Sequence, residues 1–210
     1  MITINNNMYV LDTDNTSYAF AVLGSGQLEH LYYGRKLHAN EAVMTEKHTF
    51  IPGNTNVYNK DYSSYSLEDV CLEMSSLGKG DIREPFIEVT YPNGSSTTDM
   101  VFDRAEIIQG KEEYDTLPGS YDDNGEVEQL VIYLKDRNYN LTLELHYYVY
   151  EKCDIITRSA KLVNSGNESV RLERLMSMQL DLNESDYELS FFNGAWAREM
   201  NRSRIPIRAG

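Results

Sequence analysis

Alternation of polar and apolar residues is the feature that most restricts how this chain can fold. Residues 128–134 and 140–150 place an apolar side chain at nearly every second position, which is the period of a strand with one buried face. Two further strand-like runs, 17–23 and 28–34, are separated by Gly24-Ser25-Gly26. A glycine turn between two such runs predicts a β-hairpin.

More strand candidates follow at short intervals, and the sequence shows no helical period that lasts 12 residues. We expect 86–91 to run into an Asn-Gly turn and to pair with 99–103, and 154–164 to turn into 170–182. Ten or more short strands with turns between them predict two packed antiparallel sheets. The expected fold class is therefore all-β, a large two-sheet antiparallel β-sandwich.

Residues 35–85 differ from the rest of the chain, because they hold few clean strand patterns and many small or polar residues. We expect long loops there, with one short helical turn at 66–70. Long ordered loops on a rigid scaffold are where binding and catalytic sites are often built.

Composition limits the class of protein. With 210 residues, of which 41% are hydrophobic, the chain is long enough for one large β domain, and its formal net charge is −14. Such acidity disfavours nucleic acid or an anionic membrane as a partner. The sequence has no signal peptide pattern and no run near the roughly 18 apolar residues that span a bilayer. Cys71 and Cys153 stand far apart without a metal-binding spacing, so we expect reduced thiols and a cytoplasmic protein.

Residues that could carry chemistry are present without a context that identifies a catalytic centre. The acidic candidates are Glu68 with Asp69, Asp122 with Asp123, and Asp181. In so acidic a chain we interpret them as solvated surface groups. The four histidines, His30, His38, His48 and His146, lack metal-ligand spacing, and no nucleotide-binding loop is present. We expect no cofactor, no metal and no self-contained catalytic centre.

The aromatic residues near the C-terminus are more informative. Trp196 is the only tryptophan; it follows Phe191-Phe192-Asn193-Gly194-Ala195 and precedes Arg198 and Glu199. Sugars pair flat C–H faces with hydroxyl rims, so a flat indole beside planar polar groups suits a carbohydrate. Anchoring a hydrophobic core is the equally weighted alternative for Trp196. Because this stretch lies close to Gly210, we expect the chain to be one domain of a longer protein.

Four blocks of sequence, in chain order, resemble the N-terminal domain of glycoside hydrolase family 36, the bacterial α-galactosidases. They are the opening hairpin at 24–34, the Tyr-Ser-Leu-Glu of 65–68 with the Gly-Lys-Gly-Asp-Ile-Arg-Glu-Pro of 78–85, the Glu-Lys-x-x-x-Ile-x-Arg of 151–158, and the Gly-Ala-Trp-Ala-Arg-Glu of 194–199. Together the blocks span nearly the whole chain.

The resemblance implies a β-supersandwich domain over 1–210, packed in front of a (β/α)8 barrel that this chain lacks. Two aspartates on that barrel would hydrolyse terminal α-D-galactosides, such as melibiose and raffinose-type sugars, with retention of configuration. The chain would then be a substrate-shaping and assembly domain of a cytoplasmic, homo-oligomeric enzyme, inactive by itself. Its partners would be α-galactoside sugars and its own barrel.

Only Trp196 maps onto a substrate-contact position of the family. The family also uses an acidic residue from the loop after the first hairpin. The corresponding stretch, 46–54, does not align cleanly, and Asn54 is its nearest candidate. Two alternatives remain for the chain as a whole: a stand-alone carbohydrate-binding or scaffold sandwich, and a degenerate gene remnant.

Overall fold

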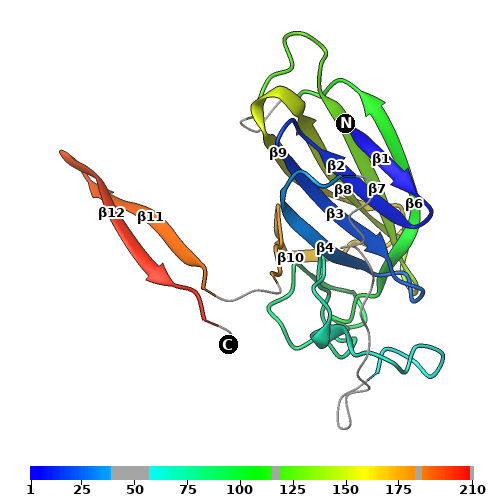
Figure 1. Cartoon of the computed structure of the whole chain (residues 1–210). Helices are drawn as coiled ribbons and strands as arrows, with labels where there is room; N and C mark the ends of the chain where they lie inside the picture. The colour runs from blue at the N-terminus through cyan, green and yellow to red at the C-terminus, as the bar shows by residue number, and fades with distance from the viewer. Residues whose placement is uncertain (39–56, 115–118, 183–185, 209–210) are drawn as a thin grey trace. The chain divides into compact units, whose positions relative to one another are not determined.

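The computed structural model describes residues 1–38, 57–114, 119–182 and 186–208. The chain divides into two compact units, Met1–Leu180 and Asp181–Gly210. The described part of the first unit contains ten strands and two short 3-10 helices (Figure 1): β1 (Ile2–Asn5), β2 (Met8–Asp12), β3 (Thr16–Val22), β4 (Leu28–Arg35), η1 (Leu67–Asp69), β5 (Ile87–Thr90), β6 (Met100–Gln109), β7 (Glu128–Asp136), β8 (Leu141–Tyr150), η2 (Glu151–Cys153), β9 (Ile155–Asn164) and β10 (Arg171–Leu175).

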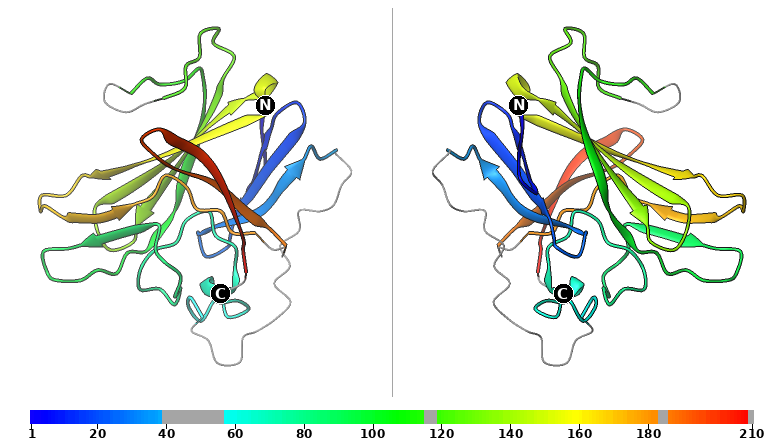
Figure 2. Two further views of the ribbon diagram at one scale, coloured as in Figure 1. Left: turned by 90° about the vertical axis from the view of Figure 1, so that its left-hand side faces the viewer. Right: turned by 90° about the vertical axis from the view of Figure 1, so that its right-hand side faces the viewer.

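Two four-stranded antiparallel sheets form the body of this unit. One has the order β1-β2-β3-β4 and the other β6-β7-β8-β9, and a two-stranded ribbon joins β5 to β10. Figure 2 shows the two larger sheets as separate layers that face each other. The predicted all-β sandwich is confirmed.

The core lies between the two sheets and is built from their alternating inward side chains. Phe20 of β3 stacks on Tyr147 of β8 with ring centroids 5.2 Å apart, and both rings are fully buried. Leu11 and Leu130 belong to the same cluster. Each fully buried large apolar side chain contributes roughly 1.5–3 kcal/mol to folding, so the packing between the two sheets stabilises the sandwich.

Several local predictions are confirmed. The runs 17–23 and 28–34 form the hairpin β3–β4, and η1 lies within the helical turn expected at 66–70. Gly26 takes a φ of +100°, and a Cβ there would lie 2.9 Å from the Cβ of Val101. A glycine is therefore required both by the turn and by the close approach of β6.

The predicted pairing of 86–91 with 99–103 is wrong. β5 pairs with β10, whereas β6 pairs with β7 over its whole length. The Asn-Gly turn does form, since the Gly94 amide donates to the Tyr91 carbonyl at 2.9 Å. However, the chain then leaves β5, and the Thr98 amide donates to the Leu77 carbonyl at 3.1 Å. A ladder of nine residue pairs with β7 offers β6 more hydrogen bonds than the four-residue β5 could.

A buried carboxylate connects the two sheets. Glu73, fully buried in the segment between η1 and β5, accepts hydrogen bonds from the hydroxyls of Tyr18 at 2.5 Å and Tyr147 at 2.7 Å. His30 Nδ1 lies 3.0 Å from the same carboxylate, and the Arg158 guanidinium lies 3.1 Å away. These four partners come from β3, β8, β4 and β9 respectively. We call this set the Glu73 cluster.

Burial alone would raise the pKa of Glu73, but the opposing effects win. The charge of Arg158 and the hydrogen bonds from His30 and Tyr18 hold the pKa of this carboxyl below its ordinary value. Glu73 is therefore ionised in the fold. Because its pKa is lower folded than unfolded, its contribution to stability is present above the unfolded pKa and is lost as the pH falls through the folded pKa.

Arg158→Met is expected to destabilise the sandwich by about 3–5 kcal/mol at pH 7, since it leaves Glu73 buried without its cation. Burial then raises the pKa of Glu73, so lowering the pH toward 5 should reduce the deficit relative to the wild-type chain. Urea unfolding followed by circular dichroism at both pH values measures both effects.

Arg171→Met is the matched control, because Arg171 is largely exposed and forms an ion pair with Glu173 at 3.0 Å. Its cost should stay within about 0.5 kcal/mol. Equal effects of the two substitutions, or a deficit for Arg158→Met that grows on acidification, would show that the cluster does not stabilise the fold.

Candidate functional site

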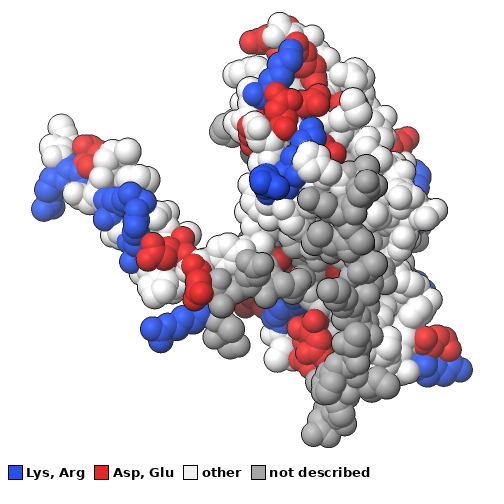
Figure 3. Space-filling view, in the orientation of Figure 1, with Lys and Arg blue, Asp and Glu red and all other residues white. Residues whose placement is uncertain are grey.

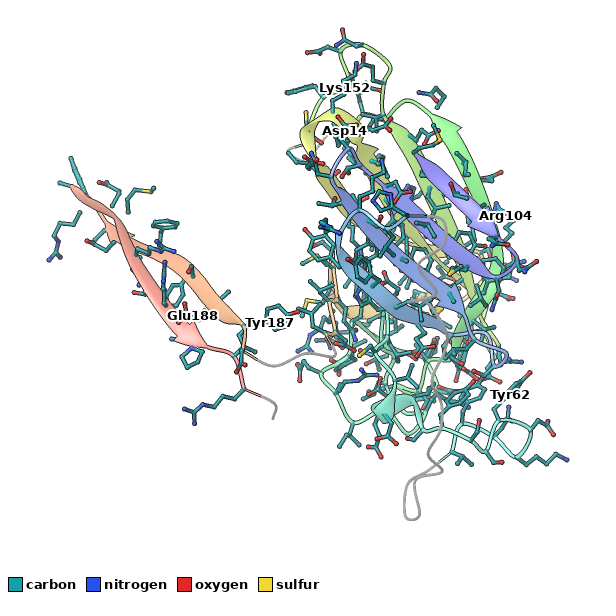
Figure 4. The ribbon with its side chains drawn as sticks, in the orientation of Figure 1. Asp14, Tyr62, Arg104, Lys152, Tyr187 and Glu188 are labelled. Carbon is teal, nitrogen blue, oxygen red and sulfur yellow. The ribbon has the colours of Figure 1, made fainter. Side chains whose placement is uncertain are left out.

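The second unit is a β-hairpin that carries the only tryptophan. It consists of β11 (Glu188–Ala195) and β12 (Arg198–Pro206), which pair antiparallel from Glu188 with Pro206 up to Ala195 with Arg198. The two residues between the strands, Trp196 and Ala197, form the turn. Figure 4 labels Tyr187 and Glu188 at the opposite, open end of the hairpin.

The backbone near the turn is constrained at three positions. A Cβ on Gly194 would lie 3.0 Å from the Cα of Glu199, so only glycine fits there without movement of the backbone. Ala197 and Met200 have φ angles of +59° and +64°, which are uncommon for residues with a side chain. A shift of register between Asn193 and Ala195 marks a bulge at this point. Bulges and strained residues of this kind often aim a side chain at a functional site.

Trp196 is 75% exposed and lies at the tip of the hairpin. Its side chain is not buried within the hairpin to which it belongs. The turn beneath it is closed by Glu199, whose Oε1 accepts a hydrogen bond from the Ala197 amide at 3.1 Å. The carbonyl of Arg198 accepts another from the Asn201 side chain at 3.0 Å. These two hydrogen bonds fix the backbone of the turn that carries the indole.

The hairpin presents a mixed surface. Its register places Leu189, Phe191 and Asn193 on one face together with Ile205 and Ser203. The opposite face combines Phe192 with the charged side chains of Glu188, Arg202 and Arg204, and both signs of charge are visible along the hairpin in Figure 3. Aromatic surface beside planar polar groups is the combination that saccharide sites use.

The acidic candidates of the first unit lie in separate elements: Glu68 and Asp69 belong to η1, and Asp122 and Asp123 to the turn before β7. Asp122 and Asp123 line a cavity of about 510 Å³, at the end of the sandwich where Lys152 is labelled in Figure 4. Asp122 accepts hydrogen bonds from the amides of its own turn, including that of Glu126 at 2.9 Å. Glu126 in turn binds Lys152 at 2.6 Å. These contacts stabilise the turn and the adjoining η2.

The remaining candidates lie apart from one another. His30 is buried in the Glu73 cluster, His38 is exposed, and His146 is buried with its Nδ1 2.9 Å from Gln129. His48 and the stretch 46–54, including Asn54, lie outside the described residues. Among the residues that the structure does describe, no group of three or more acidic, histidine or cysteine side chains could hold a metal ion. None of their helices is long and apolar enough to cross a membrane.

Cys71 and Cys153 form no disulfide with each other. Cys153 is exposed and Cys71 is half-buried. The expectation of reduced thiols agrees with this arrangement.

Sequence reasoning missed the Glu73 cluster. One signal was available: on β9 the inward positions opposite the buried side chains of β8 are occupied by Ile156, Arg158, Ala160 and Leu162. A charged residue within such an apolar series has to find a buried partner. No pattern in the sequence around Glu73 indicates that it is this partner.

The fold therefore defines the chain as an antiparallel β-sandwich followed by a β-hairpin with an aromatic residue in its turn. Residues 26–210 match the family described as Glycosyl hydrolase family 36 N-terminal domain. The chain belongs to this family.

Known relatives agree with this assignment. The chain is 32% identical over 207 residues to the bifunctional alpha-galactosidase/sucrose kinase AgaSK of Mediterraneibacter gnavus, covering 98% of this chain and 22% of that protein. The crystal structure of the alpha-galactosidase from Lactobacillus brevis is 34% identical, with a TM-score of 0.90 over 99% of this chain and 28% of that one.

A third relative was solved with a sugar bound. A variant of alpha-galactosidase AgaA from Geobacillus stearothermophilus, in complex with raffinose, is 31% identical with a TM-score of 0.90, covering 97% of this chain and 28% of that one. This chain thus spans about a quarter of the length of the proteins it matches.

Gly194→Ala should disturb the turn that supports Trp196, because the added Cβ meets backbone atoms of Glu199. We expect the amide resonances of 194–200 to shift and hydrogen exchange across the hairpin to quicken by about fivefold. Ser190→Ala, at an exposed position of the same strand, is the control and should change only its immediate neighbours. Unchanged resonances in Gly194→Ala would show that the close approach is not required.

Proposed function

We propose that this chain is the N-terminal domain of a longer α-galactosidase, in which Trp196 forms one wall of the site for a terminal α-galactoside. The observation that carries the proposal is the exposure of the only tryptophan, 75%, at the tip of a constrained turn. An exposed aromatic side chain of this size contributes binding free energy only when a ligand or a partner surface covers it. The raffinose complex of a relative supports a galactoside as the covering ligand.

In this proposal the chain shapes the substrate site and does not perform the bond cleavage. Hydrolysis with retention needs two carboxyl groups about 5–5.5 Å apart, one as the nucleophile and one as the acid/base. We place that pair on a barrel domain outside these 210 residues. Trp196 would stack on the C–H face of the galactose, fixing its position relative to the barrel and excluding water from one side.

Assembly is the second role that we propose for the hairpin. A two-stranded hairpin is marginally stable by itself in water. Among the described residues of this unit, seven large hydrophobic side chains are exposed in addition to Trp196: Tyr187, Leu189, Phe191, Phe192, Met200, Ile205 and Ile207. Contact with the barrel of the same enzyme, or with another subunit of a cytoplasmic homo-oligomer, would bury them. A coding sequence without a barrel after Gly210 would instead favour a stand-alone carbohydrate-binding or scaffold domain.

Trp196→Ala, made in the full-length enzyme, should lower kcat/KM for an aryl α-galactoside by about tenfold, the equivalent of about 1.4 kcal/mol of lost transition-state contact. Because the side chain is exposed, the melting temperature should change little, whereas truncation of a core tryptophan costs about 3–5 kcal/mol. Steady-state kinetics and thermal unfolding measure the two effects.

Tyr121→Ala is the matched control, since Tyr121 is 77% exposed but belongs to the first unit. It should leave both kinetics and melting temperature unchanged. A lower melting temperature for Trp196→Ala with unchanged kinetics per folded molecule would refute the role in substrate binding.

The isolated 210-residue chain should not hydrolyse an aryl α-galactoside, because the proposal assigns both catalytic carboxyl groups to the barrel. The measurement is release of the chromophore by the purified chain. Glu73→Gln, purified in the same way, is the control, because activity that is equal in both preparations reveals a contaminating enzyme. Turnover that follows the folded chain through purification would contradict the proposal.

A further inference from the structure

A second cavity lies entirely within the first unit, where three turns meet. Its volume is about 330 Å³, and it is lined by the turn after β5, the β7–β8 turn and the β9–β10 turn. Figure 2 draws these three turns at the same side of the sandwich. A volume of this order suits a small ligand. None of its lining residues belongs to the hairpin that carries Trp196.

The frame of this cavity is fixed by hydrogen bonds beneath it. Buried Asp136 accepts from the amides of Asn138 at 2.8 Å and Tyr139 at 3.0 Å, which sets the β7–β8 turn. On the β9–β10 turn, the Asn164 side chain accepts from the Gly166 amide at 2.9 Å. The Ser165 amide, from the same turn, donates to the Asn140 carbonyl at 2.9 Å and ties the two turns together. The walls are therefore preorganised.

One wall of the cavity is aromatic. The rings of Tyr91 and Tyr139 stack with centroids 3.5 Å apart. Tyr91 is buried and Tyr139 is half-buried. The Asn93 side chain donates to the Tyr139 hydroxyl at 3.2 Å and holds this ring in place. With Tyr91 buried and stacked against it, the half-buried ring of Tyr139 contributes, together with Pro92, the apolar part of the lining.

The rim of the cavity carries side-chain amides that the fold leaves unused. Asn138, Asn140 and Asn167 line the cavity and are exposed, and their side chains form no hydrogen bond with any residue that the structure describes. Each amide offers donors and an acceptor. Glu168, on the same rim, adds a carboxylate acceptor.

This chemistry selects one class of ligand. The lining includes no lysine, arginine or histidine, which argues against phosphate and other anions. The side-chain amides on the rim disfavour a purely apolar ligand, because such a ligand would displace their hydrating water and offer no hydrogen bonds in its place. A neutral polyhydroxylated molecule suits both parts of the lining. Its hydroxyls can form hydrogen bonds with the asparagine amides, and its C–H face can pack against the tyrosine ring.

We propose that the cavity between these three turns binds a neutral saccharide, as a site separate from the one assigned to Trp196. Such a site would hold part of a longer oligosaccharide, or a second sugar, on the accessory domain. It depends on residues of the first unit alone, so it does not rest on the role proposed for the hairpin.

The test is a nuclear magnetic resonance titration of the 15N-labelled 210-residue chain with raffinose, maltose and cellobiose, and with inorganic phosphate as the charged comparison. We expect at least one of the saccharides to shift the side-chain amide signals of Asn138, Asn140 and Asn167, and phosphate to leave them unchanged. Asn140→Ala and Asn167→Ala should each weaken that binding by about fivefold, the effect of one lost hydrogen bond.

Two controls separate this site from the rest of the molecule. Asn5→Ala, at an exposed position of β1, should leave the affinity unchanged, and Trp196→Ala should leave the shifts of the three amides in place. The proposal is overturned if none of the three saccharides moves these signals, or if Asn140→Ala and Asn167→Ala bind as the wild type does. Saccharide shifts abolished only by Trp196→Ala would also overturn it, while leaving the function proposed for the hairpin intact.

Discussion

The sandwich depends on the burial of one charge, that of Glu73. Its carboxylate is shared by side chains from both large sheets, which fixes how the sheets lie against each other in a way that apolar packing alone would not. Hydrophobic contacts are non-directional and tolerate sliding, whereas an ion pair with two tyrosine hydroxyls is satisfied in one arrangement. Replacing such a buried pair by well-packed apolar residues is often neutral for stability. We therefore attribute to Glu73 and Arg158 the alignment of the sheets as much as their stability.

The two units of the chain differ in whether their aromatic residues are buried or exposed. In the sandwich, rings such as Phe20 and Tyr147 are fully buried and contribute to folding. In the hairpin, Phe192 and Trp196 are exposed, while Ala197 and Met200 hold uncommon backbone angles. A segment with exposed aromatic side chains and strained backbone angles is expected to form its stabilising contacts with a ligand or with another part of the protein. This contrast supports the roles proposed above for the hairpin, in sugar recognition and in assembly.

Local patterns predicted the elements of this fold better than their partners. The β3–β4 hairpin, the alternating strands β7 and β8 and the turn at η1 each follow from residues that are neighbours in the sequence. The pairing of β5 was mispredicted because its partner, β10, lies some 80 residues further along the chain, and strand periodicity carries no information about such distances. For the site, the sequence singled out Trp196 and the residues around it, and the structure places Trp196 in the turn between β11 and β12. The buried partnership of Glu73 and Arg158 could not be foreseen, because it depends on two sheets meeting.

The pairing of β5 with β10 has a consequence for the order in which the chain acquires its structure. Everything from β6 to β9 lies between these strands in the sequence, so the ribbon can close only after the chain has been made as far as Leu175. Until then β5 has an unpaired edge beside a hydrophobic sequence, the kind of surface that promotes aggregation. Contacts of such long range also slow folding. During synthesis, the β6–β9 meander can form first as a local unit, and closure of the ribbon then becomes the late step that completes the sandwich.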